Sequence, residues 1–582
     1  MTTTRWRFKP FDAAKIEALS HGAGVSSLVA QILINRGILE PNAAKAFLLA
    51  KLNDLHDPEL LPGAAEAADR ITRAVRLGKK VVIYGDYDVD GVCGTSVLWA
   101  CLKLAGAENV GYYIPHRVDE GYGVNAEALK MIANEMKADL VVTVDCGISA
   151  IEEAKLAREL GLEFIITDHH TPGDDLPDAD VLVHPRIGET GYPCPDLCGA
   201  GVAFKLAWQV CKGFGDGKKA SPHMRDFLVE SLGLVALATV ADVVPLVGEN
   251  RILVRHGLNG IDSRPTVGLR ALMEVSGTFE KRKLTTGTVG FGLAPRINAA
   301  GRLERAMRAV EMLTSDDLAF ARTIASELDE CNSRRQMIEQ TIVAEAHAMI
   351  RAAGEVGERG AYVVGKEGWH PGVIGIVASR MAETYHRPAV VVALNDALSQ
   401  GSARSIPGFN LYEALKHCSD GLTGYGGHAA AAGLRLPASG FTAFAERFDA
   451  HCRQSLSPEQ KDRVLWIDAE VPLGALTLKV VEEIERLEPY GMGNPRPVLA
   501  VNDVRLVGDP KIVGERKNHV QLRIKQGEVV VKAIAWNMAD RCKSLQNETV
   551  CSIAFQPSIN EWNGRRDVQL EVKDFHVEGA GN

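Results

Sequence analysis

Short apolar runs, each followed by a stretch with helical spacing, recur between residues 79 and 170. KKVVIYG (79–85), DLVVTV (139–144) and EFIIT (163–167) have the length and β-branched content of buried strands. TSVLWACLKLAG (95–106) and EEAKLAREL (152–160) have the apolar spacing of helices. This alternation predicts a parallel α/β sheet, in which function gathers at the carboxyl ends of the strands.

The rest of the chain divides into helical and strand-rich stretches. Helical spacing covers residues 1–75, two segments between 200 and 245, and residues 302–352, which contain neither Pro nor Gly. Strand-like runs at 361–365 and 388–394 predict a second α/β lobe. After residue 464, short alternating strands separated by turns predict a small β-barrel, for which the oligonucleotide-binding (OB) type is one option.

We therefore expect an α/β protein with a first lobe built on a parallel sheet, a long connecting helix, a second α/β lobe and a C-terminal OB-like β-barrel. A polar break near 452–463 is interpreted as a linker before the barrel. The predicted parts are an N-terminal helical region (1–75), a first α/β domain (76–250), a helical part with the connecting helix (251–350), a second α/β domain (351–455) and the barrel (464–578).

The composition is that of a globular protein without membrane spans. Of 582 residues, 46% are hydrophobic and 24% charged, and no apolar stretch approaches the ~20 residues that cross a bilayer. The first residues, MTTTRWRFKPFD, lack the apolar core of a signal peptide, so we expect a cytoplasmic protein. The net charge of −9 excludes a uniformly basic surface but permits a local basic groove.

The 11 cysteines are scattered and mostly apolar in setting, which predicts reduced, buried thiols rather than a disulfide framework. Cys194 and Cys198 form a C-x3-C pair, but no second pair at zinc-site spacing accompanies it. The role of this pair stays open.

Acidic residues and histidines follow the predicted strands of the first lobe. Asp86, Asp88 and Asp90 alternate in GDYDVDG, and in an extended backbone Asp88 and Asp90 would point the same way. Clustered carboxylates repel one another unless a cation neutralises them. Asp145 ends the second strand, and Asp242 ends the apolar run 232–242. The third strand ends in Asp168, His169 and His170.

This set of side chains predicts a metal site. A solvated acidic turn is the alternative for each residue alone, but several segment ends bearing Asp or His favour a shared site. An EF-hand calcium loop would need a Glu at its twelfth position, which is missing. Mixed Asp and His ligands suit Mn²⁺ or Mg²⁺, and a carboxylate-rich site can bridge two such cations ~3.5–4 Å apart.

GDYDVDG, VTVDCGIS, TDHH and TVADVVPL resemble, in this order, the motifs of the DHH phosphoesterase family. Within that family, the resemblance is to bacterial exonucleases that degrade single-stranded DNA from the 5′ end. It implies that residues 76–250 are the DHH domain and 351–455 the DHH-associated domain. Tyr84 stands where small pyrophosphatases of the superfamily have His, which disfavours that activity. The implied metal ligands are Asp88, Asp90, Asp145, His169 and Asp242, with His170 and Asp86 as further catalytic residues.

Other motifs predict contacts with the nucleic acid. RINAAGR contributes Arg296 and Arg302 on either side of an expected small-residue turn, and GSARS contributes Ser402 and Arg404. An Arg fork and a hydroxyl can hold a phosphate, and the resemblance implies capture of the 5′-terminal phosphate; salt bridges at lobe contacts are the alternative.

GGHAAAAG (426–433) is rich in small residues, whose backbone can approach a ligand closely. A helix N-terminus there could offer N–H groups to a phosphate, and tight helix packing is the alternative interpretation. The resemblance assigns Gly426, Gly427 and His428 to the DNA backbone. In the barrel, basic and aromatic residues suit base stacking, although Trp536 could instead fill the interior. These residues are Lys517, His519, Trp536, Trp562, Arg565 and Arg566.

The leading hypothesis is a two-metal, Mn²⁺- or Mg²⁺-dependent 5′→3′ exonuclease that degrades single-stranded DNA to 5′-mononucleotides in repair and recombination. We expect a monomer that works with a helicase and a single-strand-binding protein and has no membrane partner. The alternatives are a short-oligonucleotide or cyclic-dinucleotide phosphodiesterase, whose relatives lack the N-terminal region and the barrel, and a non-catalytic single-strand-binding scaffold, which would lack ligand residues.

Overall fold

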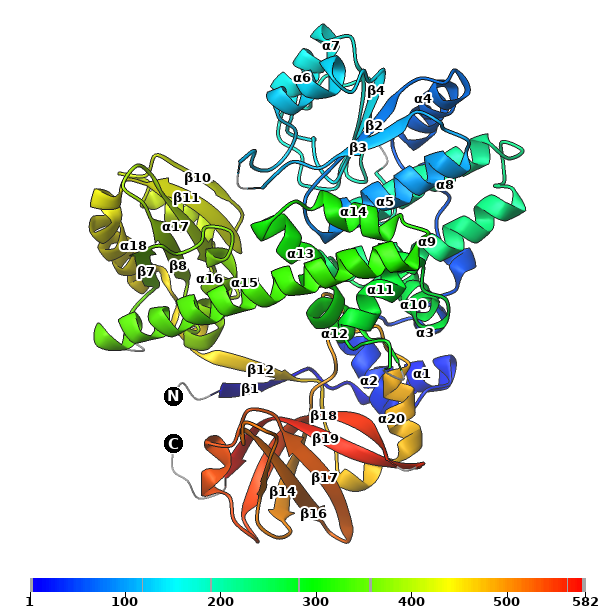
Figure 1. The fold of residues 1–582 in the computed structure, drawn as a ribbon. Helices are drawn as coiled ribbons and strands as arrows, with labels where there is room; N and C mark the ends of the chain where they lie inside the picture. Colours follow the sequence, from blue (N-terminus) through cyan, green and yellow to red (C-terminus); the bar gives the residue numbers. More distant parts are fainter. Residues whose placement is uncertain are drawn as a thin grey trace. The chain divides into compact units, whose positions relative to one another are not determined.

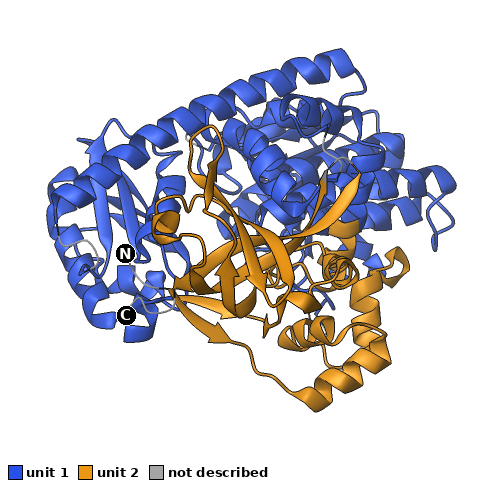
Figure 2. Ribbon diagram, turned by 90° about the horizontal axis from the view of Figure 1, so that it is seen from below, with its two compact units in different colours: residues 1–3, 56–244, 256–463 blue, residues 4–55, 245–255, 464–582 orange. Residues whose placement is uncertain are grey.

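The computed structural model describes residues 4–117, 119–188, 191–280, 283–354, 358–562 and 564–577. It forms two compact units, which Figure 2 shows in different colours. Unit 1 contains His56–Val244 and His256–Arg463, and unit 2 contains Thr4–Leu55, Pro245–Arg255 and Val464–Asn582. None of the described helices is both long and apolar enough to cross a bilayer.

Unit 1 begins with a five-stranded parallel sheet of order β3-β2-β4-β5-β6. Its central strands are buried along their whole length, as expected for a sheet with helices on both faces. Helices α6 and α7 pack on one face, and α4, α5 and α8 lie on the other (Figure 1). The strands are β2 (Val81–Gly85), β3 (Val110–Tyr113), β4 (Leu140–Val144), β5 (Glu163–Thr167) and β6 (Val181–Val183). The helices are η2 (Pro58–Leu60), α4 (Ala64–Arg76), α5 (Val89–Leu104), α6 (Ala126–Asn134), α7 (Ile151–Glu159) and α8 (Gly199–Gly213).

A helical region connects the two sheets of unit 1. The connecting helix α15 starts at Leu318 rather than near 302, because α13 and α14 precede it. RINAAGR lies inside α13, so the expected turn between its two arginines was wrong. The region contains α9 (Pro222–Ala241), α10 (Gly248–Ser263), α11 (Val267–Val275), α12 (Thr286–Thr288), the π-helical turn η3 (Val289–Leu293), α13 (Ala294–Leu303), α14 (Met307–Leu313) and α15 (Leu318–Ala352).

The second sheet of unit 1 is mixed, with order β10-β11-β9-β8-β7. The predicted strands β7 and β8 are parallel, and the others pair antiparallel. GGHAAAAG belongs to the β10–β11 hairpin, which corrects the helical alternatives, and the expected linker contains the end of α18 and all of α19. The elements are β7 (Tyr362–Glu367), α16 (Ile374–Tyr385), β8 (Ala389–Leu394), β9 (Ser399–Arg404), α17 (Leu411–His417), β10 (Gly424–Gly427), β11 (Ala431–Leu436), η4 (Ala438–Gly440), α18 (Phe441–Ser455) and α19 (Pro458–Lys461).

Unit 2 contains a seven-stranded sheet that curls so that β14 pairs with both β18 and β16. The apolar face of N-terminal helix α2 (Ser27–Asn35) shares one core with barrel strands β14 and β18. The α/β class, the parallel sheet of the first lobe and the OB-like barrel are thus confirmed. The other elements are β1 (Thr4–Phe8), α1 (Ala13–Ala23), α3 (Pro41–Leu49), η1 (Leu52–Asp54), β12 (Arg463–Ile467), β13 (Ala469–Glu470), η5 (Leu473–Ala475), α20 (Leu478–Glu485), β14 (Leu499–Leu506), β15 (Lys511–Val513), β16 (His519–Gln526), β17 (Val529–Ala535), η6 (Arg541–Ser544), β18 (Val550–Trp562) and β19 (Arg565–Val577).

Candidate metal centre and phosphate site

The acidic loop between β2 and α5 supplies three carboxylates to the strand ends. Asp86 follows β2 directly, and Asp88 caps α5 by accepting the N–H of Asp90 at 2.8 Å and of Gly91 at 3.2 Å. Asp90 lies in the first helical turn and accepts two N–H groups of α8, from Gly199 at 2.6 Å and Ala200 at 2.7 Å. Asp88 itself has an extended backbone, but Asp90 lies in the first turn of α5, so the expected extended backbone through both residues was wrong.

Asp145 follows β4 in a strained conformation. Its φ is +65°, a region that non-glycine residues rarely adopt. A Cβ atom at Gly199 would lie 2.5 Å from Asp145 Oδ1, so only glycine permits α8 to approach so closely. Strain and close approach together fix this carboxylate at the centre of the cluster.

His169 lies against three of these carboxylates. Its Nε2 is 3.2 Å from Asp145 Oδ1 and 3.7 Å from both Asp90 Oδ2 and Asp242 Oδ2. Asp242 is the C-cap of α9, so its origin is a helix end and not a strand end as the apolar run suggested. The following residue, Val243, has φ +60°, which is costly for a β-branched residue. Backbone strain thus flanks the carboxylate that α9 contributes.

His170 forms a dyad with Asp168. The buried Asp168 accepts hydrogen bonds from His170 Nδ1 at 2.8 Å and from the N–H groups of Ile148, His169 and His170. Burial alone would raise the pKa of Asp168, but these bonds and the charge of His170 hold it at about 2. Burial would lower the pKa of His170, but Asp168 and neighbouring carboxylates raise it to about 9.

The remaining carboxylates are held together against their mutual repulsion. Burial, followed by neighbouring Asp charges, raises the pKa of Asp86 and Asp145 well above the usual range, and that of Asp242 to about 8. Burial lowers the pKa of His169, which favours the neutral imidazole that binds metals. Such a cluster is stable with ionised carboxylates only when cations compensate the charge.

The donor atoms fit a pair of divalent cations. Three groups each have their ligand atoms within 4.8 Å: Asp86, Asp88 and Asp145; Asp90, His169 and Asp242; and Asp145, His169 and His170. Asp145 and His169 each belong to two groups, which is the sharing expected of adjacent ions. Asp86 Oδ1, Asp145 Oδ1 and His169 Nε2 are buried and have no hydrogen-bond partner among the described residues.

Three residues contact His170 in a way that the sequence did not predict. Asp168 was noted only as a strand-end carboxylate. The fully buried His184 donates from Nε2 to the carbonyl of His170 at 2.8 Å and accepts the N–H of Arg186 at Nδ1. The hydroxyl of Tyr122 lies 3.1 Å from His170 Nδ1. His184 follows the short strand β6, which the hydropathy pattern did not reveal.

A cationic pocket lies beside the acidic loop. Arg404 donates to Ser402 Oγ at 3.1 Å, and Arg302 donates to the carbonyl of Gly372 at 3.0 Å. Burial, then repulsion from Arg117, Arg335 and Arg404, lowers the pKa of Arg302 to about 10. No described carboxylate forms an ion pair with Arg302 or Arg404.

The first turn of α16 completes this pocket. A Cβ at Gly375 would lie 3.0 Å from Ser402 Oγ and 3.3 Å from Arg404 Nη2. Helix N-termini attract anions through their free N–H groups and the helix dipole. The pocket also lies close to the metal loop, because Asn298 of α13 accepts the N–H of Val89 at 3.2 Å.

Arg296, the other arginine of RINAAGR, does not join this pocket. Its Nε pairs with Asp329 Oδ1 of α15 at 2.7 Å, which is the salt-bridge alternative. Gly426, Gly427 and His428 are exposed at the β10–β11 hairpin. Gly426 is in register with Gly433, which in turn is in register with Ser402, so the hairpin continues the sheet beyond the phosphate pocket.

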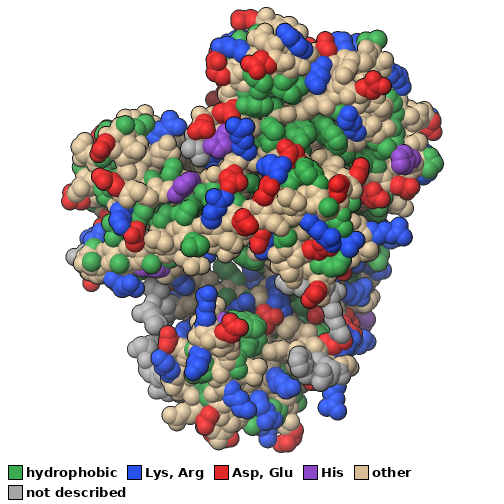
Figure 3. All heavy atoms as spheres, in the orientation of Figure 1, with side chains coloured by type: hydrophobic (Ala, Val, Ile, Leu, Met, Phe, Trp, Pro, Cys, Tyr) green, Lys and Arg blue, Asp and Glu red, His purple; other side chains and the backbone are tan. Residues whose placement is uncertain are grey.

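The barrel presents an aromatic and basic surface of its own. Trp536 is 50% exposed and packs edge-on against His519, so it does not fill the interior. Arg523 and Lys532 oppose each other on β16 and β17. Arg566 pairs with Glu482, and the side chain of Trp562 lies outside the described residues. The visible face in Figure 3 mixes acidic and basic side chains, in keeping with local rather than uniform basic character.

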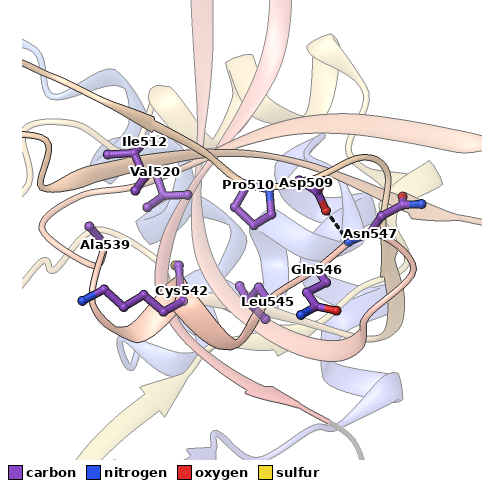
Figure 4. Close-up of a pocket in the computed structure, with 10 residues that line it drawn as sticks. Asp509, Pro510, Ile512, Val520, Ala539, Cys542, Leu545, Gln546 and Asn547 are labelled. Atoms are coloured by element: carbon purple, nitrogen blue, oxygen red, sulfur yellow. Dashed lines mark hydrogen bonds between the residues drawn. The ribbon is translucent and has the colours of Figure 1, made fainter.

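A separate barrel cavity of about 570 Å³ contains none of these residues (Figure 4). Ile512 and Val520 lie on one side of it and Leu545 on another, and Asp509 accepts the N–H of Asn547 at 3.0 Å. Its lining is apolar and amide with two charged residues, Asp509 and Lys543, and lacks the aromatic rings that stacking requires.

Comparison with known proteins gives consistent matches along the whole chain. Three family models match: the DHH family N-terminal domain at 80–239, the DHHA1 domain at 357–454 and the RecJ OB domain at 467–574. The single-stranded-DNA-specific exonuclease RecJ of Bacillus subtilis is 39% identical, covering 98% of this chain and 71% of that protein. The Escherichia coli protein of the same name is 34% identical, covering 88% and 90%.

Solved structures give the same family assignment as the sequence comparisons. The crystal structure of RecJ in complex with Mn²⁺ from Thermus thermophilus has a TM-score of 0.82 and 33% identity, and covers 98% of this chain and 79% of that one. A second structure of the same protein, in complex with Mg²⁺, has a TM-score of 0.76. The chain belongs to the RecJ family of single-stranded-DNA-specific exonucleases within the DHH phosphoesterases.

Proposed function

We propose that this chain is a 5′→3′ exonuclease that removes 5′-mononucleotides from single-stranded DNA with two Mn²⁺ or Mg²⁺ ions. The observation that carries the proposal is that two sites of opposite charge lie next to each other. A cluster of buried carboxylates includes the acidic loop, and an arginine pocket without carboxylate ion pairs adjoins this loop, because Asn298 of α13 accepts the N–H of Val89. Relatives named for this activity span nearly the whole chain.

The proposed ligands are Asp88, Asp90, Asp145, His169 and Asp242, with Asp86 completing the cluster. Bound divalent ions lower the pKa of water and neutralise charge on a phosphoryl group. The protein's own part is geometric: Gly199 and the strain at Asp145 fix the central carboxylate, and α8 N–H groups fix Asp90.

His170 is the proposed group that acts on the scissile phosphate. In the metal-free protein the hydrogen bond to Asp168 and the neighbouring carboxylates raise the pKa of His170, which favours its protonated form, and Asp168 fixes the ring through Nδ1. A protonated imidazole next to the cluster can neutralise negative charge on the phosphate or give a proton to the leaving oxygen.

The arginine pocket explains the proposed polarity. Arg302, Arg404, Ser402 and the first turn of α16 would hold a terminal phosphate, as an anion in a cationic pocket. With that end anchored, the next phosphate along the strand would lie at the residues that would hold the metals. Gly426, Gly427 and His428 would contact the strand where the hairpin extends the sheet.

The direct test is digestion of single strands labelled at either end, with Mn²⁺. We expect 5′-mononucleotides to appear from the 5′ end, and Asp145→Asn to lose this activity. Digestion from the 3′ end, or undiminished activity of Asp145→Asn, would refute the proposal. Comparison of long strands with dinucleotides and cyclic dinucleotides tests the alternative phosphodiesterase; we expect preference for long strands.

We further propose that the enzyme acts as a monomer in the cytoplasm, where its DNA lies, in repair and recombination. Because only unpaired strands fit the proposed substrate class, a helicase and a single-strand-binding protein are the expected partners. Nuclease assays on duplex DNA, with and without an added helicase, would test this dependence.

A further inference from the structure

An unusually exposed aromatic ring lies on the rim of a second cavity in unit 1. Phe291, in the π-helical turn η3, is 89% exposed. The cavity has a volume of about 370 Å³, within the ~300–1,000 Å³ of small-molecule sites, and residues of α13, α15 and α16 line it. Single π-turns inside helices occur often at functional sites. The protein therefore keeps a large apolar side chain in solvent at a cavity mouth.

The cavity shares a wall with the proposed phosphate pocket. Arg302 and Asn298, one turn apart on α13, line the cavity. Arg302 also faces Arg404 and Arg117, and Asn298 holds the acidic loop at Val89. A strand end whose phosphate lies at Arg302 thus has this cavity as an adjoining space.

The polar groups of the cavity suit a nucleoside. Gln336 and Gln340, four residues apart on α15, are exposed, and their amides have no hydrogen-bond partner among the residues described. Amide side chains can pair with the donor and acceptor edge of a base. Glu339 pairs with both Arg335 and Arg380, and together with Arg302 these arginines make the lining of the cavity cationic.

We propose that this cavity, here called the Phe291 pocket, binds the base and sugar of the 5′-terminal deoxynucleotide, with the Phe291 ring stacked on the base. The inference rests on the proposed function, because it needs a DNA end at Arg302. Aromatic stacking tolerates every base, so the pocket would hold the end without sequence preference. It would also retain the nucleotide to be released until the bond is cut.

Fluorescence of 2-aminopurine, which falls when the base stacks, tests the pocket without catalysis. The probe is a short 5′-phosphorylated strand with 2-aminopurine as its first base, bound to Asp145→Asn protein with Mn²⁺. We expect quenching that Phe291→Ala abolishes and Phe291→Tyr retains. Met337→Ala is the matched control, because Met337 is 69% exposed on α15 but does not line the pocket. Quenching that survives Phe291→Ala overturns the inference.

Kinetics with an abasic first nucleotide give a second arm. On a normal strand, Phe291→Ala should lower kcat/KM about 5- to 150-fold, the loss expected for one stacked base. On the abasic strand, the same variant should match the unsubstituted enzyme. An equal loss on both strands, or none on either, overturns the pocket. If the unsubstituted protein neither binds nor degrades phosphorylated strands, the proposed function itself fails.

Discussion

Replacement of Arg404 by Gln should remove the preference for a 5′-phosphate while sparing the metal centre. Arg404 is half-buried, donates to Ser402, and has no carboxylate partner among the described side chains. Its charge is therefore available to a ligand. A hydrogen bond from a charged group contributes about 1.5–3 kcal/mol. The ratio of kcat/KM for 5′-phosphorylated over 5′-hydroxyl strands should thus fall about 10- to 150-fold.

The assay compares two strands of the same sequence that differ only at the 5′ end, in Mn²⁺. Arg296→Gln is the control, because it makes the same change in the motif that contains Arg302. Arg296 is already paired with Asp329, so its loss should leave the ratio unchanged even if it costs some stability. Mn²⁺ affinity should be unaltered in both variants, since neither residue lies among the clustered donors.

Two results would refute this reasoning. If Arg404→Gln lowers activity equally on both strands, the guanidinium supports the fold or the strand as a whole rather than the terminal phosphate. If Arg296→Gln changes the ratio as much as Arg404→Gln, the assignment of only one arginine of RINAAGR to the pocket is wrong.

Three further predictions follow from other parts of the molecule. Gly199→Ala should lower kcat at least ~100-fold while the circular dichroism spectrum is retained. The new Cβ would lie 2.5 Å from Asp145 Oδ1, and a misplaced catalytic group lowers the rate by about this factor. Gly201→Ala, whose Cβ would lie 3.4 Å from Leu197, should be tolerated. The free energy of unfolding of the metal-free protein should fall as pH rises from 5 to 8, by up to ~1.4 kcal/mol per pH unit for each group of this kind. The reason is that folded Asp242, with a pKa of about 8, keeps a proton that the unfolded chain releases near pH 4. Thermal melts with chelator should show this decline and saturating Mn²⁺ should remove it; a melting temperature that rises with pH without metal would contradict the assignment. Trp536→Ala should weaken binding of long single strands by ~1–3 kcal/mol in anisotropy titrations, while Trp466→Ala, similarly exposed on β12, should not.

Periodicity predicted most of the fold, and it failed where a strand is too short or too uniform in residue type to show a pattern. The central strands β2, β4 and β5 are continuous apolar runs because helices cover both faces of the sheet. The edge strands β3 and β6 are only four and three residues long, too short for a pattern to develop. The hairpin β10–β11 was missed because glycine and alanine carry no polar–apolar alternation.

The candidate site was predictable in its members but not in its geometry. Asp and His at segment ends identified the cluster, because only a few residue types can bind a metal ion. Whether Arg296 or Arg302 faces the anion depends on the helical phase of α13 and on Asp329 across from it, which no local pattern shows. His184 was invisible because a single buried histidine beside a short strand resembles any other core residue.

The construction of unit 2 from distant segments bears on how the chain is made. The helices of residues 4–55 bury Val29, Ile32 and Leu33 against strands that begin after residue 464. At ~5–20 residues per second, a ribosome needs on the order of tens of seconds to deliver those strands. Until then the N-terminal helices have no barrel to cover their apolar faces, whereas the DHH sheet can form from consecutive βα units. The nascent chain therefore exposes the apolar surface of its N-terminal helices during synthesis, and truncated products should be prone to aggregation and to binding by chaperones.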